Sequence, residues 1–300
     1  TYRAQYIDLL STTMPRDMIL EVANWDGVVM LDDIGKAEPH MADAVPAMGV
    51  DQVWENHGIY GEGISIAIVD TGVDNAHVGL DDMDDNQFTF DDMKVVAYYD
   101  AVQDAVICQP CLPGESLDSG THGTHVAGIA AGTGAGEPAP DGTPHIGVAP
   151  KANLVNVLSC CDGDIEDIIR GVEWTIANQK AVTPHIRVMT SSLGEQQVEF
   201  HIDNDGSSAW SQAVDAAVES GLVVTLSAGN EFGSLTAAGC NTIDSPGDSR
   251  LPITVASLDK DLSLAIYSSR GYTSDGRVKP DVATIGSNIM APNKGTGTGY

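Results

Sequence analysis

The chain has 300 residues, of which 42% are hydrophobic, enough for one large core or for one core with a small appendage. Its 43 acidic and 14 basic residues give a formal net charge of −29, which repels nucleic acid and anionic membranes. Because no run of about eighteen apolar residues occurs, the sequence predicts no membrane span. Charge and hydropathy therefore argue against nucleic-acid-binding and membrane-spanning proteins.

Charge and cysteine usage bear on the compartment in which the protein works. The acidic excess is mostly Asp, which suits a high-salt or calcium-rich exterior, with ordinary solubility as the alternative explanation. Cys108 and Cys111 flank a Gln-Pro pair, Cys160 and Cys161 are adjacent, and Cys240 is isolated. A zinc site would need a second pair with matching spacing, which the adjacent pair lacks. We therefore predict a local disulfide between Cys108 and Cys111, and a bridge from the adjacent pair to Cys240, as in an oxidising compartment.

Residues 2–35 have the pattern of a small unit of their own. We predict a strand over residues 2–7, a helix over 14–25 and a second strand over 28–31. So few residues cannot bury much core alone, and the unit is therefore expected to dock on the larger body.

The remainder of the chain alternates strands with helices. After a loop containing Pro39 and Pro46, a short helix is predicted over residues 50–55. Near-continuous apolar runs predict buried parallel strands at residues 64–69, 94–99, 153–158, 186–191, 222–227 and 253–257. Asp164 is expected to cap one helix, and Ser207 or Ser208 another. This alternation indicates an α/β sandwich with a mostly parallel central sheet.

Polar residues follow three of these strands, and ligand-binding residues gather at the carboxyl ends of strands in such folds. Asp70 follows the first strand, residues 191–194 follow the fourth, and residues 228–230 follow the fifth. His122 begins a predicted helix whose Gly and Ala residues indicate close packing on a neighbour. We expect these groups to lie at one edge of the sheet.

Asp70, His122 and Asn230 supply, in that order, three groups that acyl transfer uses. A carboxylate orients an imidazole and stabilises its protonated form, the imidazole takes a proton from a hydroxyl, and an amide donates to a tetrahedral oxyanion. Singly, Asp70 or His122 could be no more than a polar cap of a helix. Together they indicate a catalytic site.

Four blocks of sequence resemble the signature blocks of the subtilisin-like serine proteases. They are Asp-Thr-Gly-Val-Asp at 70–74, His-Gly-Thr-His-Val-Ala-Gly at 122–128, Ser-Leu-Gly at 192–194 and Ser-Ala-Gly-Asn at 227–230. The resemblance runs, in family order, over roughly residues 45–300, and the secreted archaeal branch looks nearest. It implies a three-layer sandwich with a mostly parallel central sheet.

The resemblance implies roles for the matching residues. Asp70 corresponds to the orienting carboxylate, His122 to the general base and acid, and Asn230 to the side-chain donor to the oxyanion. A polypeptide substrate would bind as an added extended strand, with residues 158–163 on one side. The other side would be a pocket lined by Ser192, Leu193, Gly194, Ala228 and Gly229. His125 would pack behind His122, and the other histidines are interpreted as polar residues of the surface or core: His40, His57, His77, His145, His185 and His201.

The same resemblance gives the N-terminal residues a candidate identity. Their predicted strand, helix and strand resemble the latter half of the inhibitory propeptide of these proteases, a small α+β unit that occupies the site until it is cut. A permanent N-terminal extension is the alternative. The expected organisation is a propeptide-like unit at 1–36, a linker with a processing site at 37–48, and a catalytic domain at 49–300.

The sequence departs from the family pattern at the nucleophile. The serine of the family lies in a Gly-Thr-Ser-Met-Ala block after a stretch that resembles residues 289–300, and the sequence contains no such block. We therefore expect a separate or missing C-terminal segment to carry the serine, and this polypeptide by itself to be inactive.

A second departure concerns calcium. Family members often hold calcium through an Asp at the position of Gly79. The nearby Asp81, Asp82, Asp84 and Asp85 could bind calcium through oxygen ligands instead, with a solvated loop as the alternative.

The sequence thus predicts the proteolytic part of a secreted or cell-surface serine endopeptidase that works through an acyl-enzyme. The alternative is a catalytically inactive subtilisin-like module that serves as a structural or binding component of a cell-surface assembly. The presence of Asp70, His122 and Asn230 together favours the enzyme.

Overall fold

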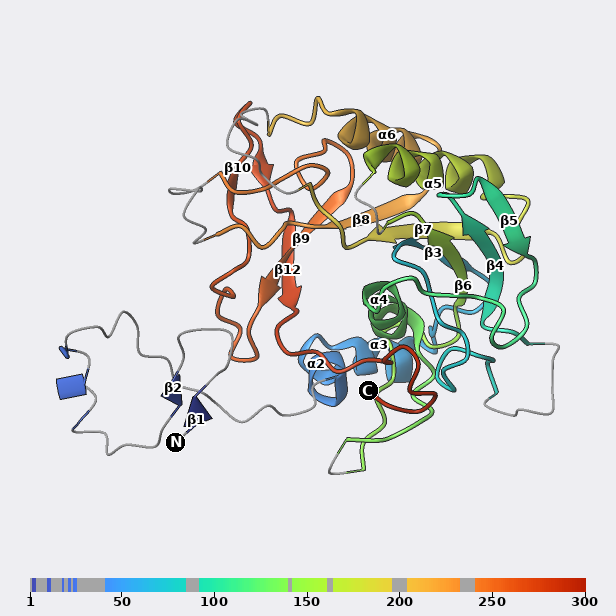
Figure 1. Ribbon diagram of the computed structural model, residues 1–300, viewed down its shortest axis with the longest axis horizontal. Coiled ribbons are helices and arrows are strands. Elements are labelled where there is room, and N and C mark those ends of the chain that lie inside the picture. The colour runs from blue at the N-terminus through green and yellow to red at the C-terminus, as the bar shows by residue number, and fades with distance from the viewer. Residues whose placement is uncertain are drawn as a thin grey trace. The chain divides into compact units, whose positions relative to one another are not determined.

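The structure is a computed structural model that describes residues 2–3, 10–11, 18, 21–22, 24–25, 41–84, 92–139, 142–160, 164–195, 204–232 and 241–300. The chain divides into two compact units, Thr1–Glu38 and Pro39–Tyr300 (Figure 1). In the first unit, β1 (Tyr2–Arg3) pairs antiparallel with β2 (Leu10–Ser11). The strand predicted at residues 28–31 and most of the helix predicted at 14–25 lie outside the described residues.

The second unit is built around a sheet whose described strands have the order β12-β9-β8-β7-β3-β6-β4-β5. Adjacent strands are parallel, except that β4 and β5 are antiparallel. The bounds are β3 (Ser65–Asp70), β4 (Val95–Asp100), β5 (Ala105–Cys108), β6 (Asn153–Leu158), β7 (Ile186–Ser191), β8 (Val223–Ser227), β9 (Ile253–Leu258) and β12 (Val282–Ile285). The six predicted strands are therefore confirmed, and the first of them, β3, is fully buried.

Helices cover both faces of this sheet and complete three layers (Figure 1). On one face, α5 (Ile165–Asn178) and α6 (Ala209–Glu219) bury Val172, Trp210 and Val214 against β3, β6, β7 and β8. On the other, α4 (His122–Ala131) places Ala127 and Ala131 against Ile66 and Ile68 of β3. The chain therefore has the predicted three-layer α/β sandwich with a mostly parallel central sheet. None of the described helices is both long and apolar enough to cross a membrane.

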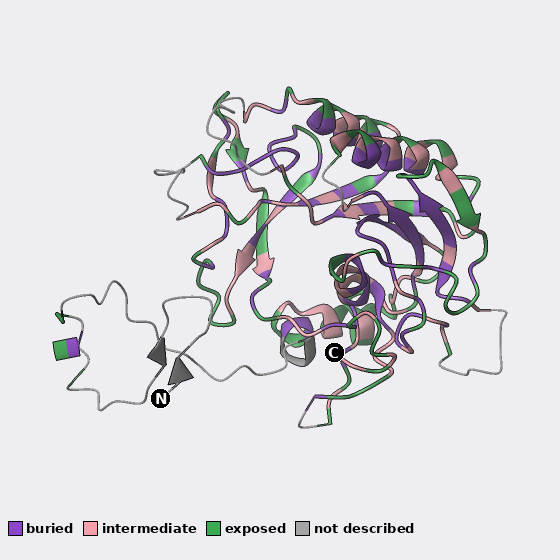
Figure 2. Cartoon of the chain, in the orientation of Figure 1, coloured by how far each residue is buried: buried purple, intermediate pink, exposed green. Residues whose placement is uncertain are grey.

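The face that α4 covers continues towards β12 without a described helix over β8 and β9. The strand register pairs Ile66 with Val188 and Val188 with Val223, so these three side chains lie on the same face of the sheet. The pairing of β8 with β9 and of β9 with β12 places Ile253 and Val282 on that face as well. Val223, Ile253 and Val282 on this face are 50%, 39% and 51% exposed, which Figure 2 shows as green segments on these strands. Parallel sheets usually have both faces covered, so this apolar surface is unusual.

Side chains cap the N-termini of two helices as predicted. Asp164 caps α5 by accepting a hydrogen bond from the amide of Glu166, and Ser208, one of the two predicted candidates, caps α6 through the amide of Ser211. The helix α3 (Val50–His57) occurs where a short helix was expected.

One local prediction was wrong, and several elements were not predicted. The loop expected around Pro39 and Pro46 contains the helix α2 (Met41–Ala47), which includes Pro46 in its last turn and ends one residue later. Proline costs this helix one amide donor without preventing a short helix that ends beside it. The missed strands of the second unit are β5 and β12 in the large sheet, and β10 (Gly271–Tyr272) with β11 (Val278–Lys279), which pair antiparallel. In the first unit, β2 was not predicted.

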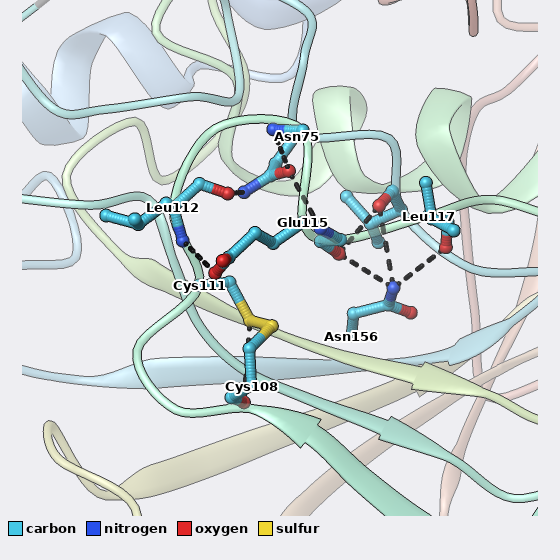
Figure 3. The surroundings of a disulfide bond; sticks show 10 residues. Asn75, Cys108, Cys111, Leu112, Glu115, Leu117 and Asn156 are labelled. Atoms are coloured by element: carbon cyan, nitrogen blue, oxygen red, sulfur yellow. Dashed lines mark hydrogen bonds between the residues drawn. A yellow bond between two sulfur atoms is a disulfide. The ribbon is translucent and has the colours of Figure 1, made fainter.

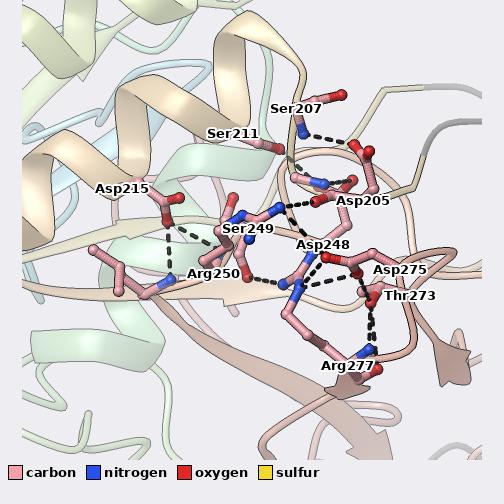
Figure 4. Close-up of polar contacts among 12 residues, drawn as sticks. Asp205, Ser207, Ser211, Asp215, Asp248, Ser249, Arg250, Thr273, Asp275 and Arg277 are labelled. Carbon is pink, nitrogen blue, oxygen red and sulfur yellow. Dashed lines mark hydrogen bonds and ion pairs between the residues drawn. The ribbon is translucent and has the colours of Figure 1, made fainter.

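A polar cluster ties the start of α6 to the segment before β9 and to the β10–β11 hairpin (Figure 4). The buried carboxylate of Asp248 accepts hydrogen bonds from the Ser211 hydroxyl at 2.6 Å and the Gly206 amide at 3.0 Å. Arg277 donates from Nε to both carboxylate oxygens of Asp275, at 3.0 and 2.9 Å. Hydrogen bonds from Arg277, and then from Thr273, lower the pKa of Asp275 to about 2.

Candidate active site

The structure brings Asp70 and His122 into direct contact at the carboxyl edge of the sheet. Asp70 is the last residue of β3 and is fully buried, whereas the imidazole of His122, the first residue of α4, is 49% exposed. Their Oδ1 and Nδ1 atoms are 2.8 Å apart. The amide of Thr71 also donates to Oδ1 of Asp70, while Oδ2 is buried without a hydrogen-bond partner among the described residues.

This contact fixes the chemistry available to His122. The carboxylate accepts from Nδ1, so a neutral imidazole carries its proton there and presents Nε2 as a base. The hydrogen bond from His122 to Asp70 raises the pKa of His122 most, burial opposes that rise, and the charges of Asp70 and then Asp118 add to it. A partly exposed imidazole with a raised pKa is suited to accepting and returning a proton.

Glycines allow α4 to lie very close to its neighbours. A Cβ on Gly123 would meet the carbonyl oxygen of Gly72 at 2.1 Å, and a Cβ on Gly128 would meet Cδ of Pro292 at 2.1 Å. Both separations are far shorter than any real carbon contact. The small residues predicted to allow close packing therefore hold the helix of His122 against the turn that follows Asp70.

His125 lies one helical turn beyond His122 and has a structural role. Its Nε2 atom is 2.9 Å from the carbonyl oxygen of Ile289, and burial lowers its pKa. This bond fixes the segment 289–292 against α4.

The remaining described histidines fit their interpretation as polar residues of the surface or core. His77 and His145 are buried, with ring centroids 5.2 and 4.7 Å from that of Tyr300. Nδ1 of His185 is 3.1 Å from the carbonyl oxygen of Val182, and His57 lies in the last turn of α3. His40 and His201 lie outside the described residues.

The residues predicted to bind substrate follow the strands on one side of β3. Ser192, Leu193 and Gly194 come directly after β7, the neighbour of β3, and Ala228, Gly229 and Asn230 directly after β8. Asn230 is exposed, and no hydrogen bond joins its side chain to His122 in the described part of the chain. The sheet order thus puts these residues at the same edge as Asp70.

The acidic residues predicted to bind calcium lie at the opposite edge. Asp81, Asp82 and Asp84 precede β4, and Asp82 forms an isolated bridge with Met93. Over the residues that are described, no group of three or more His, Cys, Asp or Glu side chains is arranged to hold a metal ion. Asp85 lies outside these residues, so the calcium site stays a prediction.

The predicted local disulfide is confirmed, and it begins the loop that leads to α4 (Figure 3). Cys108 and Cys111 are joined, with Cα atoms 5.0 Å apart. The second predicted bridge, from Cys160 or Cys161 to Cys240, stays a prediction because Cys161 and Cys240 lie outside the described residues.

Sequence reasoning missed two residues that surround the Asp–His pair. The buried carboxylate of Asp118 accepts a hydrogen bond from the Thr71 hydroxyl at 2.7 Å, and Thr71 in turn accepts one from the Gly123 amide at 2.9 Å. Asp118 stands four residues before His122, and a loop carboxylate that close to a helix start is the signal that could have pointed to it.

The sheet order and this Asp–His pair at its carboxyl edge define a subtilisin-like α/β protein. The chain belongs to the subtilase family of S8 peptidases, whose match covers residues 61–299. It is 33% identical over 242 residues to serine protease AprX of Bacillus subtilis strain 168, covering 77% of this chain and 48% of that protein. It is 27% identical over 278 residues to subtilisin E of the same strain, covering 90% and 61%. The chain therefore spans about half to three-fifths of the length of these relatives.

A solved structure shows the same fold. The structure of the Clostridium perfringens CspB protease superposes with a TM-score of 0.71 at 17% identity, covering 86% of this chain and 83% of that one. The likeness in sequence is low, so this match bears on the fold alone.

Proposed function

We propose that the chain is the proteolytic part of a secreted serine endopeptidase, with Asp70 and His122 as two members of an Asp-His-Ser triad. The observation that carries this proposal is the buried Asp70 carboxylate, which holds Nδ1 of a half-exposed His122 at 2.8 Å. Subtilase membership supports the reaction type and a polypeptide substrate.

In this reaction, Nε2 of His122 takes the proton of a serine hydroxyl as its oxygen attacks the carbonyl carbon of the peptide bond. Asp70 stabilises the imidazolium that forms. The imidazolium then gives its proton to the leaving amine, which departs and leaves an acyl-enzyme. A water molecule, deprotonated by the same imidazole, hydrolyses the acyl-enzyme and regenerates the serine.

Asn230 is proposed to stabilise the negatively charged oxygen of the tetrahedral intermediate. Its side chain is exposed just after β8, two strands from β3. The substrate would lie as an extended strand between residues 158–163 and the segment Ser192–Gly194, with Ala228 and Gly229 lining the pocket beyond. Removing such an amide from subtilisin lowers kcat by about 10²–10³-fold, and we expect a similar loss for Asn230→Ala in the active protein.

The serine is proposed to come from a further C-terminal segment that packs on the exposed sheet face. Val223, Ile253 and Val282 present an apolar surface there, on the side of the sheet that α4 covers further along. A helix on this face would bury that surface, with a gain of about 25 cal/mol per Å². The first turn of this helix would then lie at the edge of the sheet where His122 lies.

Several finer parts of the proposal concern the whole protein. Residues 1–36 are proposed to be a propeptide remnant that acts in cis, which the division of the chain near residue 38 supports. Secretion is supported by the Cys108–Cys111 disulfide and the net charge of −29. Calcium binding near Asp81 and membership of the archaeal branch stay predictions.

A serine-directed fluorophosphonate probe on the full-length protein tests the function. We expect one labelled serine, with labelling and peptide hydrolysis both lost in His122→Ala. Absence of any labelled serine in a folded protein would instead favour the inactive module of a cell-surface assembly. Surface variants outside the site, such as Lys260→Gln, serve as controls for folding and should keep the labelling of the wild type.

A further inference from the structure

We propose that Asp118 is a positioning residue for the Asp–His pair: its carboxylate clamps the helix of His122 to the turn that follows Asp70. This inference rests on the proposed function for its meaning in catalysis. The clamp itself is a property of the described residues and can be measured without any activity.

The carboxylate of Asp118 connects the two elements that carry the pair. Towards β3, its Oδ1 atom accepts a hydrogen bond from the Thr71 hydroxyl at 2.7 Å. Towards α4, Oδ2 accepts from the amide of Thr124 at 3.0 Å and from its hydroxyl at 2.5 Å. Oδ1 also accepts from the amide of Gly120 at 2.8 Å. Asp118 is 4% exposed, so these bonds form away from bulk water, and each carboxylate oxygen accepts from one of the two elements.

Asp118 and Thr71 also do the work of a helix cap. The first amides of a helix have no partner within it and are normally satisfied by the residue just before the first turn. Here that residue, Thr121, makes no side-chain capping bond. The amides of Gly123 and Thr124 are instead satisfied by Thr71 and Asp118. The helix that begins with His122 is therefore stabilised by contacts to the turn of Asp70, so helix formation and correct placement of His122 are coupled.

The loop that carries Asp118 is itself held firmly (Figure 3). The Asn75 side chain accepts hydrogen bonds from the amides of Gly114 and Ser116. The buried side chain of Asn156, in β6, donates to the Ser116 hydroxyl at 2.8 Å and to the Leu117 carbonyl at 3.0 Å. With the disulfide at its start, this loop provides a rigid support for the carboxylate.

The charges that face His122 come from the elements on every side of it. Asp70 on β3 and Asp118 on the loop are negative and raise its pKa, and His125 on α4 itself, if protonated, would oppose them. Asp118 thus adds a second negative charge near the imidazolium without contacting it. Neutralising Asp118 is expected to lower the pKa of His122, because one of the negative charges that raise it is removed.

The test is an NMR titration of the His122 imidazole in the full-length protein, comparing wild type with Asp118→Asn. We expect a lower His122 pKa in the variant and, in active protein, an acid limb of kcat displaced to lower pH, with kcat reduced and KM unchanged. Asp100→Asn is the matched control, because Asp100 is also buried at this edge, at the end of β4, yet is not among the charges that act on His122. It should leave the His122 pKa as in wild type. An unchanged His122 pKa in folded Asp118→Asn would overturn the proposal.

A second variant keeps the proposal testable if Asp118→Asn does not fold. Asp118→Glu retains the charge but displaces the acceptor oxygens by one methylene. We therefore expect the His122 pKa to stay raised above its ordinary value, as in wild type, while kcat falls. An unchanged kcat in this variant would refute the positioning role. Should the wild-type protein prove to have no peptidase activity, the proposed function fails, while the NMR comparison still decides whether Asp118 acts on His122.

Discussion

The close approach of Gly123 to the turn that follows Asp70 gives a prediction that can be worked out in detail. Replacing this glycine by alanine, Gly123→Ala, should break the Asp70–His122 hydrogen bond. The new methyl carbon would lie 2.1 Å from the carbonyl oxygen of Gly72 and 3.1 Å from Cβ of Asp70. The first of these neighbours is backbone, which cannot rotate away as a side chain can. The start of α4 must therefore move away from the turn that follows Asp70.

The size of this movement follows from the distances. Carbon and carbonyl oxygen approach to about 3.3 Å without repulsion, so the helix start must retreat by more than about 1 Å. The bond from Nδ1 of His122 to Asp70 is 2.8 Å long, and a retreat of that size takes it past the range of a hydrogen bond. Overpacking of this kind costs about 1–3 kcal/mol, against a gain of about 1 kcal/mol for replacing Gly by Ala in a helix.

The pH dependence gives the sharper readout. In wild type the pKa of His122 is raised above its ordinary 6.5. The pair therefore contributes stability that is fully present below the pKa of His122 in the unfolded chain. This stability is lost as the pH rises through the pKa of His122 in the folded protein. In Gly123→Ala the main cause of the raised pKa is removed, so this contribution should largely disappear.

Gly128→Ala is the matched control. It introduces the same methyl group in the same helix, again 2.1 Å from its neighbour, but that neighbour is Pro292. It should lower the free energy of unfolding in denaturant titrations while leaving the His122 pKa raised in NMR titrations. If Gly123→Ala folded with the His122 pKa of wild type, the close contact would not be what places His122, and the reasoning would be wrong.

Three further predictions test other contacts. Arg277 lowers the pKa of Asp275 from 3.8 to about 2, so the stability that Asp275 contributes is present above pH 3.8 and is lost as the pH falls to about 2. Arg277→Gln should therefore flatten the pH dependence of the free energy of unfolding over this range. Denaturant titrations at several pH values measure this slope, and a wild-type slope in the variant would contradict the assignment. Replacing both Cys108 and Cys111 by Ala should lower the free energy of unfolding by about 2 kcal/mol, as loop entropy predicts for so short a loop. Wild type with its disulfide reduced should unfold at a denaturant concentration similar to that of the double variant. Asp164→Ala should lose about 1 kcal/mol of stability by thermal unfolding, whereas Asp164→Ser should keep most of it; equal losses would argue against capping.

The elements that the sequence predicted are those in which local pattern and tertiary environment agree. The strand β3 is buried along its whole length, and four consecutive apolar residues form its middle, so its sequence has a single interpretation. By contrast, β5 lies at the edge of the sheet with exposed Val106 and Ile107, and β12 is four residues long with two of them exposed. Their stability comes from a partner strand already in place, and short segments of this kind leave no periodic signal.

The same distinction explains what could be predicted of the site. Asp70 ends a strand and His122 begins a helix, and element ends are visible in a sequence, so the pair could be predicted before its geometry was known. The role of Asp118 depends on a loop whose path is set by Asn75 and Asn156. That path arises from contacts between residues far apart in the chain, which no local pattern records.

The place of β3 in the middle of the sheet has a consequence for how the molecule forms. Its two neighbours, β6 and β7, begin at Asn153 and Ile186, long after β3 itself ends at Asp70. As the chain emerges from the ribosome, the central strand therefore has no parallel partner until more than half of these 300 residues have been made. Asp70 therefore cannot reach its final buried position, at the end of β3, before β6 and β7 have been made.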